Sequence, residues 1–460
     1  MHNKKLIGLM LATTLLASTI LAACTGDSGS STSPADSSSA GSSQGASSAP
    51  DAAPVEIRAA WWGDTNRHEL YNRILDEFEK EYPNVTCVPE PTSWADYWDK
   101  MQVQTASGNA PDFMGMHPQY ASDYIRRGIV EPLDGFIADG VITTEGWSQG
   151  TLETGMLDGV NYMLAMGVTF SCSFVNEGFV RELGLEPPPF DWSWDDMKTW
   201  GQQVRAALDE QGKSDSWVVI DDSANLNSWR YFVRQQGREI YNADGTIGFV
   251  AQDAEKWWTM FNEFRELGIV PDAATTTEYF NATLEDSLFS RDKILIARVP
   301  VNQYKLYCDT FPDKEVGIIR NQTGGSMGSE VGEFPEGAHF AVSANTTDDK
   351  KLAAAQLLNF WVNTDTSLGI FGLDQGVPGN LDKADAYAPN LDEYQVKIQE
   401  FVGTLSDIAT PSTFPPSGAS EVDAAFRNLA EQVQFGYEEP AAAAEEFYNQ
   451  AVEIVSNSAS

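Results

Sequence analysis

Two adjacent tryptophans followed by charged side chains form the segment of this sequence that is best suited to bind a ligand. The segment reads Trp61-Trp62-Gly63-Asp64, and Arg67 and His68 follow it. A rigid indole gives a large contact area to an apolar ligand surface at a low cost in conformational entropy. Asp and Arg supply charged hydrogen bonds that suit a ligand rich in hydroxyl groups, although Asp64 is equally suited to cap a helix. Because strand side chains alternate, one indole should face inward and the other outward, and we favour Trp62 over Trp61 as the ligand platform.

Strands that alternate with helices are expected to position these groups. Val55, Ile57 and Ala59 alternate with charged residues, which predicts a strand that ends at the two tryptophans. A strand that begins near Pro111 should carry His117 to the same sheet edge, where ligands of open α/β sheets bind. The sequence also predicts strands at 85–88, 217–220 and 293–297, and helices at 70–82, 97–106, 193–204, 254–267, 352–361, 422–433 and 441–455. This alternation predicts an α/β fold with mainly parallel sheets and helices on both faces.

The first 54 residues have the pattern of an export leader and a tether. Lys4 and Lys5 precede the uncharged run Leu6–Leu21, which is short for a membrane-spanning helix of about 20 apolar residues. Leu21-Ala22-Ala23-Cys24 resembles a bacterial lipobox, so we expect a signal peptide at 1–23 and an acylated Cys24 that anchors the protein to the outer face of the cell membrane. An ordinary signal peptide with a chance cysteine is the alternative. Residues 25–54 are rich in Ser, Gly and Ala and predict a flexible tether.

Composition excludes several classes of protein. With 67 acidic and 29 basic residues, the chain has a formal net charge of −38, which argues against nucleic-acid binding because that binding needs Lys and Arg. The histidines form no HxxxH or HExxH pattern and no nucleophile elbow is present, so we predict no metal site, no cofactor and no catalytic residues. Cys87, Cys172 and Cys308 allow one disulfide and a free thiol, or three buried thiols.

A series of short motifs, found in order, resembles one family. The matching segments are Phe78–Val85, Asp99–Asp112, Gly128–Leu133, Phe174–Trp194, Ala338–Ser343 and Gly376–Pro378. With the lipobox, they make the chain similar to the family 1 extracellular solute-binding proteins, the sugar-capturing components of ABC importers, which are related in plan to maltose-binding protein. The string from Trp61 to His68 resembles the subgroup that binds pectin-derived and other plant-polysaccharide oligosaccharides.

The resemblance implies a two-lobe, type II periplasmic-binding-protein fold with hinge strands between the lobes. Lobe 1 would contain 55–165 and 341–375, and lobe 2 would contain 171–336 and 381–460. The protein would then be a monomer that binds an oligosaccharide, with or without uronate groups, and docks on ABC permease subunits. The resemblance also implies ligand contacts for His117, Gln119, Arg298, and Trp229 or Tyr231, with His339, Gln375 and Asp423 as weaker candidates. Core packing is the competing role for Trp229 and Tyr231.

Two other functions remain as alternatives. One is a secreted polysaccharide-degrading lipoprotein enzyme, because acidic residues are abundant enough to form a hydrolase pair of carboxylates. The other is a glycan-binding surface lipoprotein that takes no part in transport.

Overall fold

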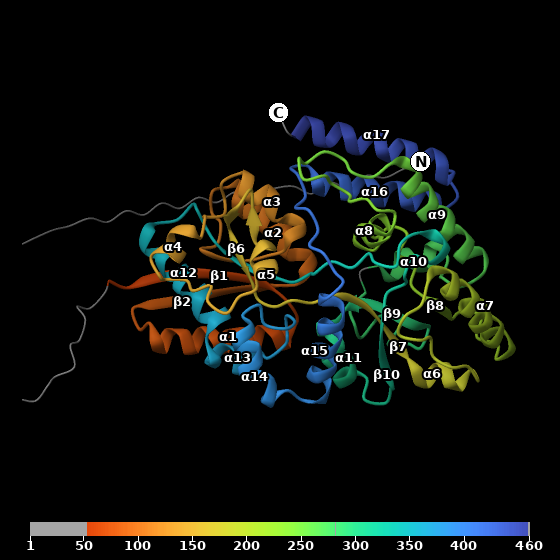
Figure 1. The fold of residues 1–460 in the computed structure, drawn as a ribbon, viewed down its shortest axis with the longest axis horizontal. Helices are drawn as coiled ribbons and strands as arrows, with labels where there is room; N and C mark the ends of the chain where they lie inside the picture. Colours follow the sequence, from red (N-terminus) through yellow and green to blue (C-terminus); the bar gives the residue numbers. More distant parts are fainter. Residues whose placement is uncertain (1–52, 281, 459–460) are drawn as a thin grey trace, which may run out of the picture. The chain divides into compact units, whose positions relative to one another are not determined.

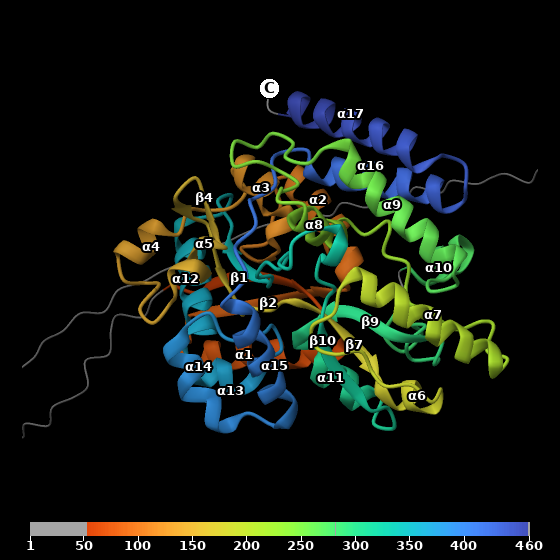
Figure 2. The same ribbon diagram turned by 45° about the vertical axis from the view of Figure 1, so that its right-hand side comes forward.

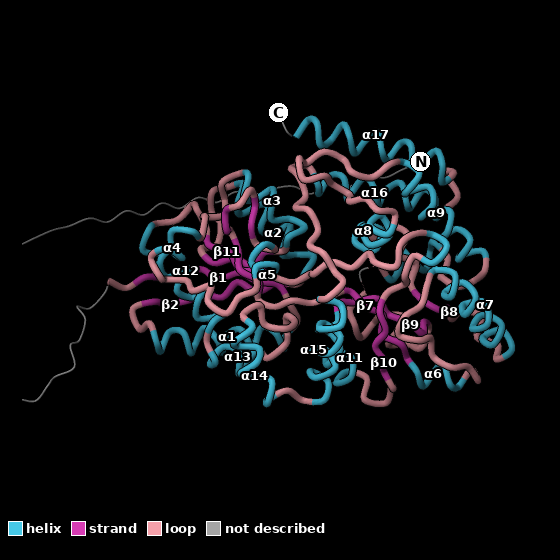
Figure 3. Tube along the Cα trace, viewed as in Figure 1, coloured by secondary structure: helices cyan, strands magenta, loops and turns pink. Residues whose placement is uncertain are grey.

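Two mixed β-sheets organise the part of the chain that the computed structural model describes, residues 53–280 and 282–458 (Figure 1). Figure 3 shows the strands as two separate groups. The predicted signal peptide, the predicted lipid-bearing Cys24 and nearly all of the predicted tether lie outside the described residues. Within the described residues, no helix combines the length and the apolar character that crossing a membrane requires.

The first sheet has the strand order β2-β1-β3-β11-β6. Its strands are β1 (Val55–Trp62), β2 (Val85–Thr92), β3 (Phe113–Met116), β6 (Met163–Ala165) and β11 (His339–Val342). Strand β1 is parallel to β2 and β3, whereas β11 is antiparallel to β3 and β6. The strand predicted to begin at Val55 is therefore confirmed, and it lies inside the sheet between two parallel neighbours.

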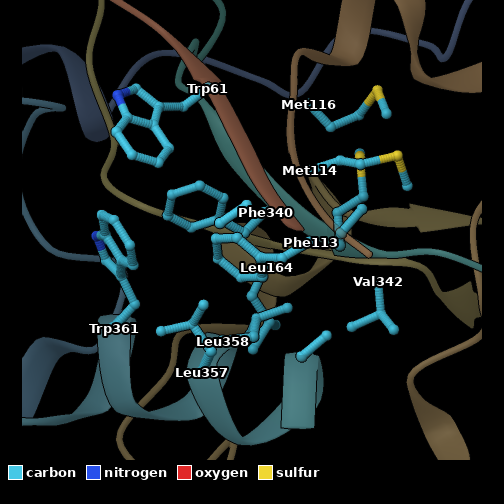
Figure 4. Close-up of a cluster of buried hydrophobic side chains, with 14 of the residues drawn as sticks. Trp61, Phe113, Met114, Met116, Leu164, Phe340, Val342, Leu357, Leu358 and Trp361 are labelled. Carbon is cyan, nitrogen blue, oxygen red and sulfur yellow. The ribbon is translucent and has the colours of Figure 1, made fainter. Parts of the chain in front are cut away.

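Helices cover both faces of this sheet and form its hydrophobic core with it. They include α1 (Thr65–Glu81), α2 (Trp94–Ala106), α3 (Pro118–Arg126), α4 (Asp134–Ala138), α5 (Gln149–Glu153), α12 (Asp348–Asn363) and α13 (Asp365–Phe371). Figure 4 shows Trp61, Phe113 and Phe340 gathered with Trp361 of α12 on one side of the strands. Trp61 and Trp62 do lie on opposite faces of β1, but both are buried, because helices cover each face. The expectation that one indole faces outward is thus wrong.

The second sheet has the order β10-β7-β9-β8 and a core of its own. Its strands are β7 (Ser171–Asn176), β8 (Trp217–Val219), β9 (Ile294–Pro300) and β10 (Val316–Arg320). Only the β8–β9 pair is parallel, because β7 runs antiparallel to both of its neighbours. Both sheets are therefore mixed, which corrects the prediction of mainly parallel sheets. A small hairpin, β4 (Met156–Leu157) and β5 (Val160–Asn161), lies apart from both.

The remaining helices include those that surround the second sheet. They are α6 (Glu177–Glu182), α7 (Trp194–Glu210), α8 (Leu226–Gln235), α9 (Ala251–Glu266), α10 (Ala273–Tyr279), α11 (Tyr304–Thr310), α14 (Leu381–Tyr387), α15 (Glu393–Ser406), α16 (Ala419–Gln434) and α17 (Pro440–Ser458). Helix α17 packs against α9 and α16 in both views (Figures 1 and 2). At the start of α7, Ser193 and Asp196 form a capping box, in which each side chain accepts a hydrogen bond from the other residue's backbone N–H.

Three segments lie side by side between the two sheets. Val168 and Val377 exchange backbone hydrogen bonds of 2.7 and 2.9 Å, and Thr169 and Glu336 exchange bonds of 2.9 and 2.8 Å. Gly376 has a φ of +107°, and a Cβ added there would lie 2.2 Å from the Val168 carbonyl oxygen. This contact of backbone on backbone requires glycine. The hinge strands that the resemblance implies, and the lobe boundaries, stay predictions.

Candidate functional site

A groove of about 600 Å³ lies between helices of the first sheet and helices that surround the second sheet. One wall comes from α2 and α3, and the other comes from the start of α8, from Phe280 and from α16 (Figure 1). The first wall includes Trp94, Trp98, Gln119, Tyr120 and Tyr124, and the second includes Asn225, Asn227, Phe280, Asp423 and Arg427. Both walls carry polar side chains, and the first, which we call the aromatic wall, adds four aromatic rings. This combination orients a hydroxyl-rich ligand.

The aromatic wall has an exposed face and a buried support. Trp94 is 41% exposed, and Trp98 lies against Tyr120 with ring centroids 4.2 Å apart. Behind them Trp62 is only 8% exposed and lies 5.0 Å from the Trp94 ring and 5.5 Å from the Trp98 ring. Trp62 is absent from the lining of the groove. We therefore assign the platform role to Trp94 and Trp98, with Trp62 as the buried support that holds their rings.

A smaller pocket of about 150 Å³ adjoins the groove, because Asn225 and Asn227 line both. Arg298 lies on its wall, where Nη1 is 2.8 Å from Asp222 Oδ2 and Nη2 is 2.5 Å from Gln322 Oε1. The guanidinium also lies over the Trp194 ring, 5.1 Å from its centroid. The pair neutralises the charge of Arg298, although burial still raises the pKa of Asp222. Arg298 can donate to a ligand here, but it is not a free cation.

Two histidines of the predicted site, the half-buried His117 and the buried His339, are held as neutral rings. His117 caps α3, where Nδ1 accepts from the Gln119 backbone N–H at 3.3 Å, and its ring lies edge-on to Trp94. Burial, with smaller contributions from His339 and Arg230, lowers the pKa of His117 to about 3. His339 Nε2 lies 2.9 Å from Thr154 Oγ1, and burial lowers its pKa to about 4. At neutral pH both act as polar supports close to the groove, not as cations.

A second group of predicted site residues forms a structural cluster at the start of α1. Asp64 Oδ1 accepts from the Arg67 backbone N–H at 2.8 Å, so the capping alternative is the one that the structure displays. Arg67 Nε lies 2.7 Å from Asp374 Oδ2, and Gln375 Nε2 donates to the same oxygen at 3.3 Å. His68 Nδ1 accepts from Trp61 Nε1 at 3.2 Å. These contacts tie α1 to the segment after α13.

Burial also separates the remaining candidates. Trp61 is 1% exposed and Trp229 is fully buried against Phe426 and Phe249, so we leave both out of the proposed site. Tyr231 lines the smaller pocket and donates to Glu333 Oε1 at 2.6 Å. Asp423 lines the groove with Arg427, and burial raises its pKa.

Sequence reasoning missed the two groove tryptophans and the two asparagines at the start of α8. Trp94 and Trp98 are four residues apart, so they share one face of α2, and this spacing was a detectable signal. Asn225 and Asn227 carried no such signal, because Asn is a common helix-capping residue and Asn225 does cap α8. Among residues 53–280 and 282–458, no cluster of three metal-ligating side chains occurs. The cysteines 87, 172 and 308 are all free thiols.

Comparison with known proteins places the chain in a family. Residues 73–397 match the bacterial extracellular solute-binding proteins, and the chain belongs to that family. A candidate binding protein of Brucella abortus is 23% identical over 408 residues, which are 86% of this chain and 91% of the relative. The family binds solutes outside the cytoplasm.

Solved structures show the same fold. An oligogalacturonide-binding protein of Yersinia enterocolitica, in complex with saturated digalacturonic acid, is 17% identical with a TM-score of 0.75 and covers 88% of this chain and 99% of its own. A maltose/maltodextrin-binding domain of Bdellovibrio bacteriovorus bound to maltotriose is 18% identical with a TM-score of 0.70, and the coverage is 87% and 99%. The predicted α/β, periplasmic-binding-protein-like fold is therefore confirmed.

Proposed function

We propose that this protein captures an oligosaccharide and delivers it to the permease subunits of an ABC importer. The groove is the observation that carries this proposal. Trp94 is exposed there, beside the paired rings of Trp98 and Tyr120, and Asn225 and Asn227 face the same space. Aromatic rings cover the apolar faces of sugars, and amide and carboxylate groups bind their hydroxyls. The solved relatives that bind digalacturonic acid and maltotriose support the same class of ligand.

Capture would involve closure of the two groove walls on the ligand. The walls come from elements on either side of the three adjacent crossing segments, which are short and would act as a hinge. Lobes at 55–165 with 341–375, and at 171–336 with 381–460, remain our assignment. A ligand that contacts both walls stabilises the closed state in proportion to its extra contacts there.

The start of the sequence supports an anchored, extracytoplasmic binding protein. The lipobox-like Leu21–Cys24 would place an acylated Cys24 in the outer face of the cell membrane, and 25–54 would let a monomeric binding body reach its permease. We assign no catalysis, since the family is a binding-protein family. Two proposals compete with this one. The first is a polysaccharide-degrading lipoprotein, and the second is a surface glycan-binding lipoprotein without a permease.

Binding without turnover tests this function. The protein should bind members of a glycan array that contains pectic, maltodextrin and other plant oligosaccharides, and mass spectrometry should recover the bound glycan intact. Small-angle scattering should show a smaller radius of gyration with saturating ligand. Cleaved product would favour the enzyme, and failure to bind any glycan would overturn the proposal. Loss of glycan uptake in a strain that lacks the gene for this protein would separate transport from mere surface binding.

A further inference from the structure

Arg230 of α8 is a buried cation that has no ion-pair partner among the residues that the structure describes. The residue is only 7% exposed. It forms no hydrogen bond and no ion pair with any residue of the described ranges, and its guanidinium carbon lies 5.5 Å from the centroid of the Phe334 ring. The burial of a guanidinium without a partner costs on the order of several kcal/mol in stability. Buried arginines are therefore normally paired.

The arginines around it are all paired. Arg234 lies one turn further along α8 and covers the same Phe334 ring at 5.6 Å, yet it forms an ion pair with Glu239 and donates to the Thr410 carbonyl at 2.9 Å. Arg298 pairs with Asp222, and Arg320 pairs with Glu333. Arg230 therefore differs from its neighbours in its lack of a carboxylate and not in its burial.

Arg230 is absent from the lining of the groove but lies beside it. It lines a recess of about 10 Å³, enough for roughly one water-sized group. Gln119, Tyr120, Leu226 and Ser420 line both this recess and the groove. On its other side, Phe334 belongs to the lining of the smaller pocket. The guanidinium thus lies where the two hollows of the candidate site approach each other.

The charges near Arg230 do not replace an ion pair. Glu239, Glu336 and Asp423 are the carboxyl groups within its electrostatic reach, and none of them is bonded to it. Glu239 is paired with Arg234. Asp423 is paired with Arg427, and Glu336 accepts a hydrogen bond from Asn227 Nδ2 at 2.9 Å. His117 and Tyr241, which also lie within reach, are neutral at physiological pH, since burial lowers the pKa of His117 to about 3 and raises that of Tyr241.

We propose that Arg230 receives a carboxylate of the bound glycan, so that the ligand of this protein contains a uronic acid. A guanidinium binds a carboxylate through two parallel hydrogen bonds, and burial strengthens them. Arg67 and Arg298, the other cations expected at the site, already have Asp374 and Asp222 as partners. This inference rests on the proposed function, because it names the ligand class of the same groove.

Matched ligands and matched variants test the inference in the full chain. The ligands are trigalacturonic acid and its fully methyl-esterified form, which differ only in the ionised carboxylates, with maltotriose as a neutral reference. Calorimetry should show the acid bound at least about tenfold more tightly than the ester by the unaltered protein. Arg230→Gln should abolish this preference while it leaves the affinity for the ester within about threefold. Arg234→Gln is the matched control, because Arg234 also belongs to α8 and also lies over the Phe334 ring. This variant should keep the preference for the acid.

The outcomes separate two failures. Equal affinity for acid and ester, tighter binding of maltotriose than of the acid, or an unchanged preference in Arg230→Gln would overturn the role of Arg230 and leave glycan capture standing. If no glycan binds to the folded protein, the proposed function itself fails. Should Arg230→Gln not fold, Arg230→Lys keeps the charge but loses the two-pronged geometry, and it should reduce the preference severalfold. An undiminished preference in Arg230→Lys would count against two-pronged recognition.

Discussion

Trp94 and Trp62 lie edge to face, with ring centroids 5.0 Å apart and ring planes at 80°, so that an exposed indole rests on a buried one. Tyr97 completes the support, since it lies 5.2 Å from Trp62 and donates its hydroxyl to the Gly115 carbonyl at 2.7 Å. A rigid ring loses little entropy when a sugar binds to it. Trp94 is therefore the exposed ring of the pair and Trp62 is its buried support, whereas the sequence had favoured Trp62 as the ligand platform.

Substitution of Trp94 should weaken glycan binding and leave the fold intact. We expect Trp94→Ala to lower affinity by about 10- to 100-fold, because truncated tryptophan anchors commonly cost 1–3 kcal/mol. Trp62→Ala should instead lower the free energy of unfolding by about 3–5 kcal/mol, as a buried aromatic does. Titration calorimetry and urea denaturation measure the two effects. Tyr437→Ala is the control, since this residue is 77% exposed and is absent from the lining of the groove. Equal affinities of Trp94→Ala and the control would remove the platform role.

The pair of Asp222 and Arg298 should be strongly coupled. Asp222→Asn and Arg298→Met should each cost about 3–5 kcal/mol, because each leaves a buried group without its partner. The double variant should cost clearly less than the sum of the two single variants. The control is Asp215→Asn, whose ion pair with Lys293 is largely exposed, and it should change stability by less than about 1 kcal/mol. Additive losses in the double-mutant cycle would show that the pair is not a unit.

Glu336 should make folding stability depend on pH between about 4.5 and 7. Burial raises the pKa of this carboxyl from 4.5 to about 7, against the opposing effect of Arg230. The native state therefore keeps the proton that the unfolded chain has lost, and Glu336 loses its stabilising contribution as pH rises through this window. The advantage of Glu336→Gln over the unaltered protein should grow by on the order of 1–3 kcal/mol from pH 5 to pH 8.

Urea denaturation at the two pH values measures this growth. Glu445→Gln, an exposed position on α17, is the control and should show no such change. A constant difference between Glu336→Gln and the unaltered protein at pH 5 and pH 8 would refute the raised pKa.

Glycine is required at position 376 by the contact between crossing segments. In Gly376→Ala the new Cβ would lie 2.2 Å from the Val168 carbonyl oxygen, at a φ of +107° that side chains rarely adopt. We expect a loss of about 2–4 kcal/mol in the free energy of unfolding, measured by urea or thermal denaturation. Gly369→Ala in α13 has open space around its Cβ and should be neutral or stabilising by up to about 1 kcal/mol. Similar stabilities for the two variants would contradict the backbone contact.

Local patterns determined the elements and the family of this protein. The alternation from Val55 predicted a strand, and the helical patterns at 70–82 and 193–204 predicted helices, all of which the structure confirms. These signals are readable because strand period, helix period and end caps depend on residues only a few positions apart. The ordered motifs likewise predicted a solute-binding protein, which the family match confirms.

Tertiary structure alone decided which side chains form the groove. Arg67 meets a carboxylate 307 positions away, and Arg298 meets Asp222, so two predicted ligand cations are already neutralised. Arg230, which no local pattern distinguished, pairs with no carboxylate of the described residues and lines a recess that adjoins the groove. Trp62 was predicted to be a platform, but α2 covers it with Trp94 and Trp98. Pairing and exposure depend on which distant elements pack together, and a single sequence carries no periodic signal for such contacts.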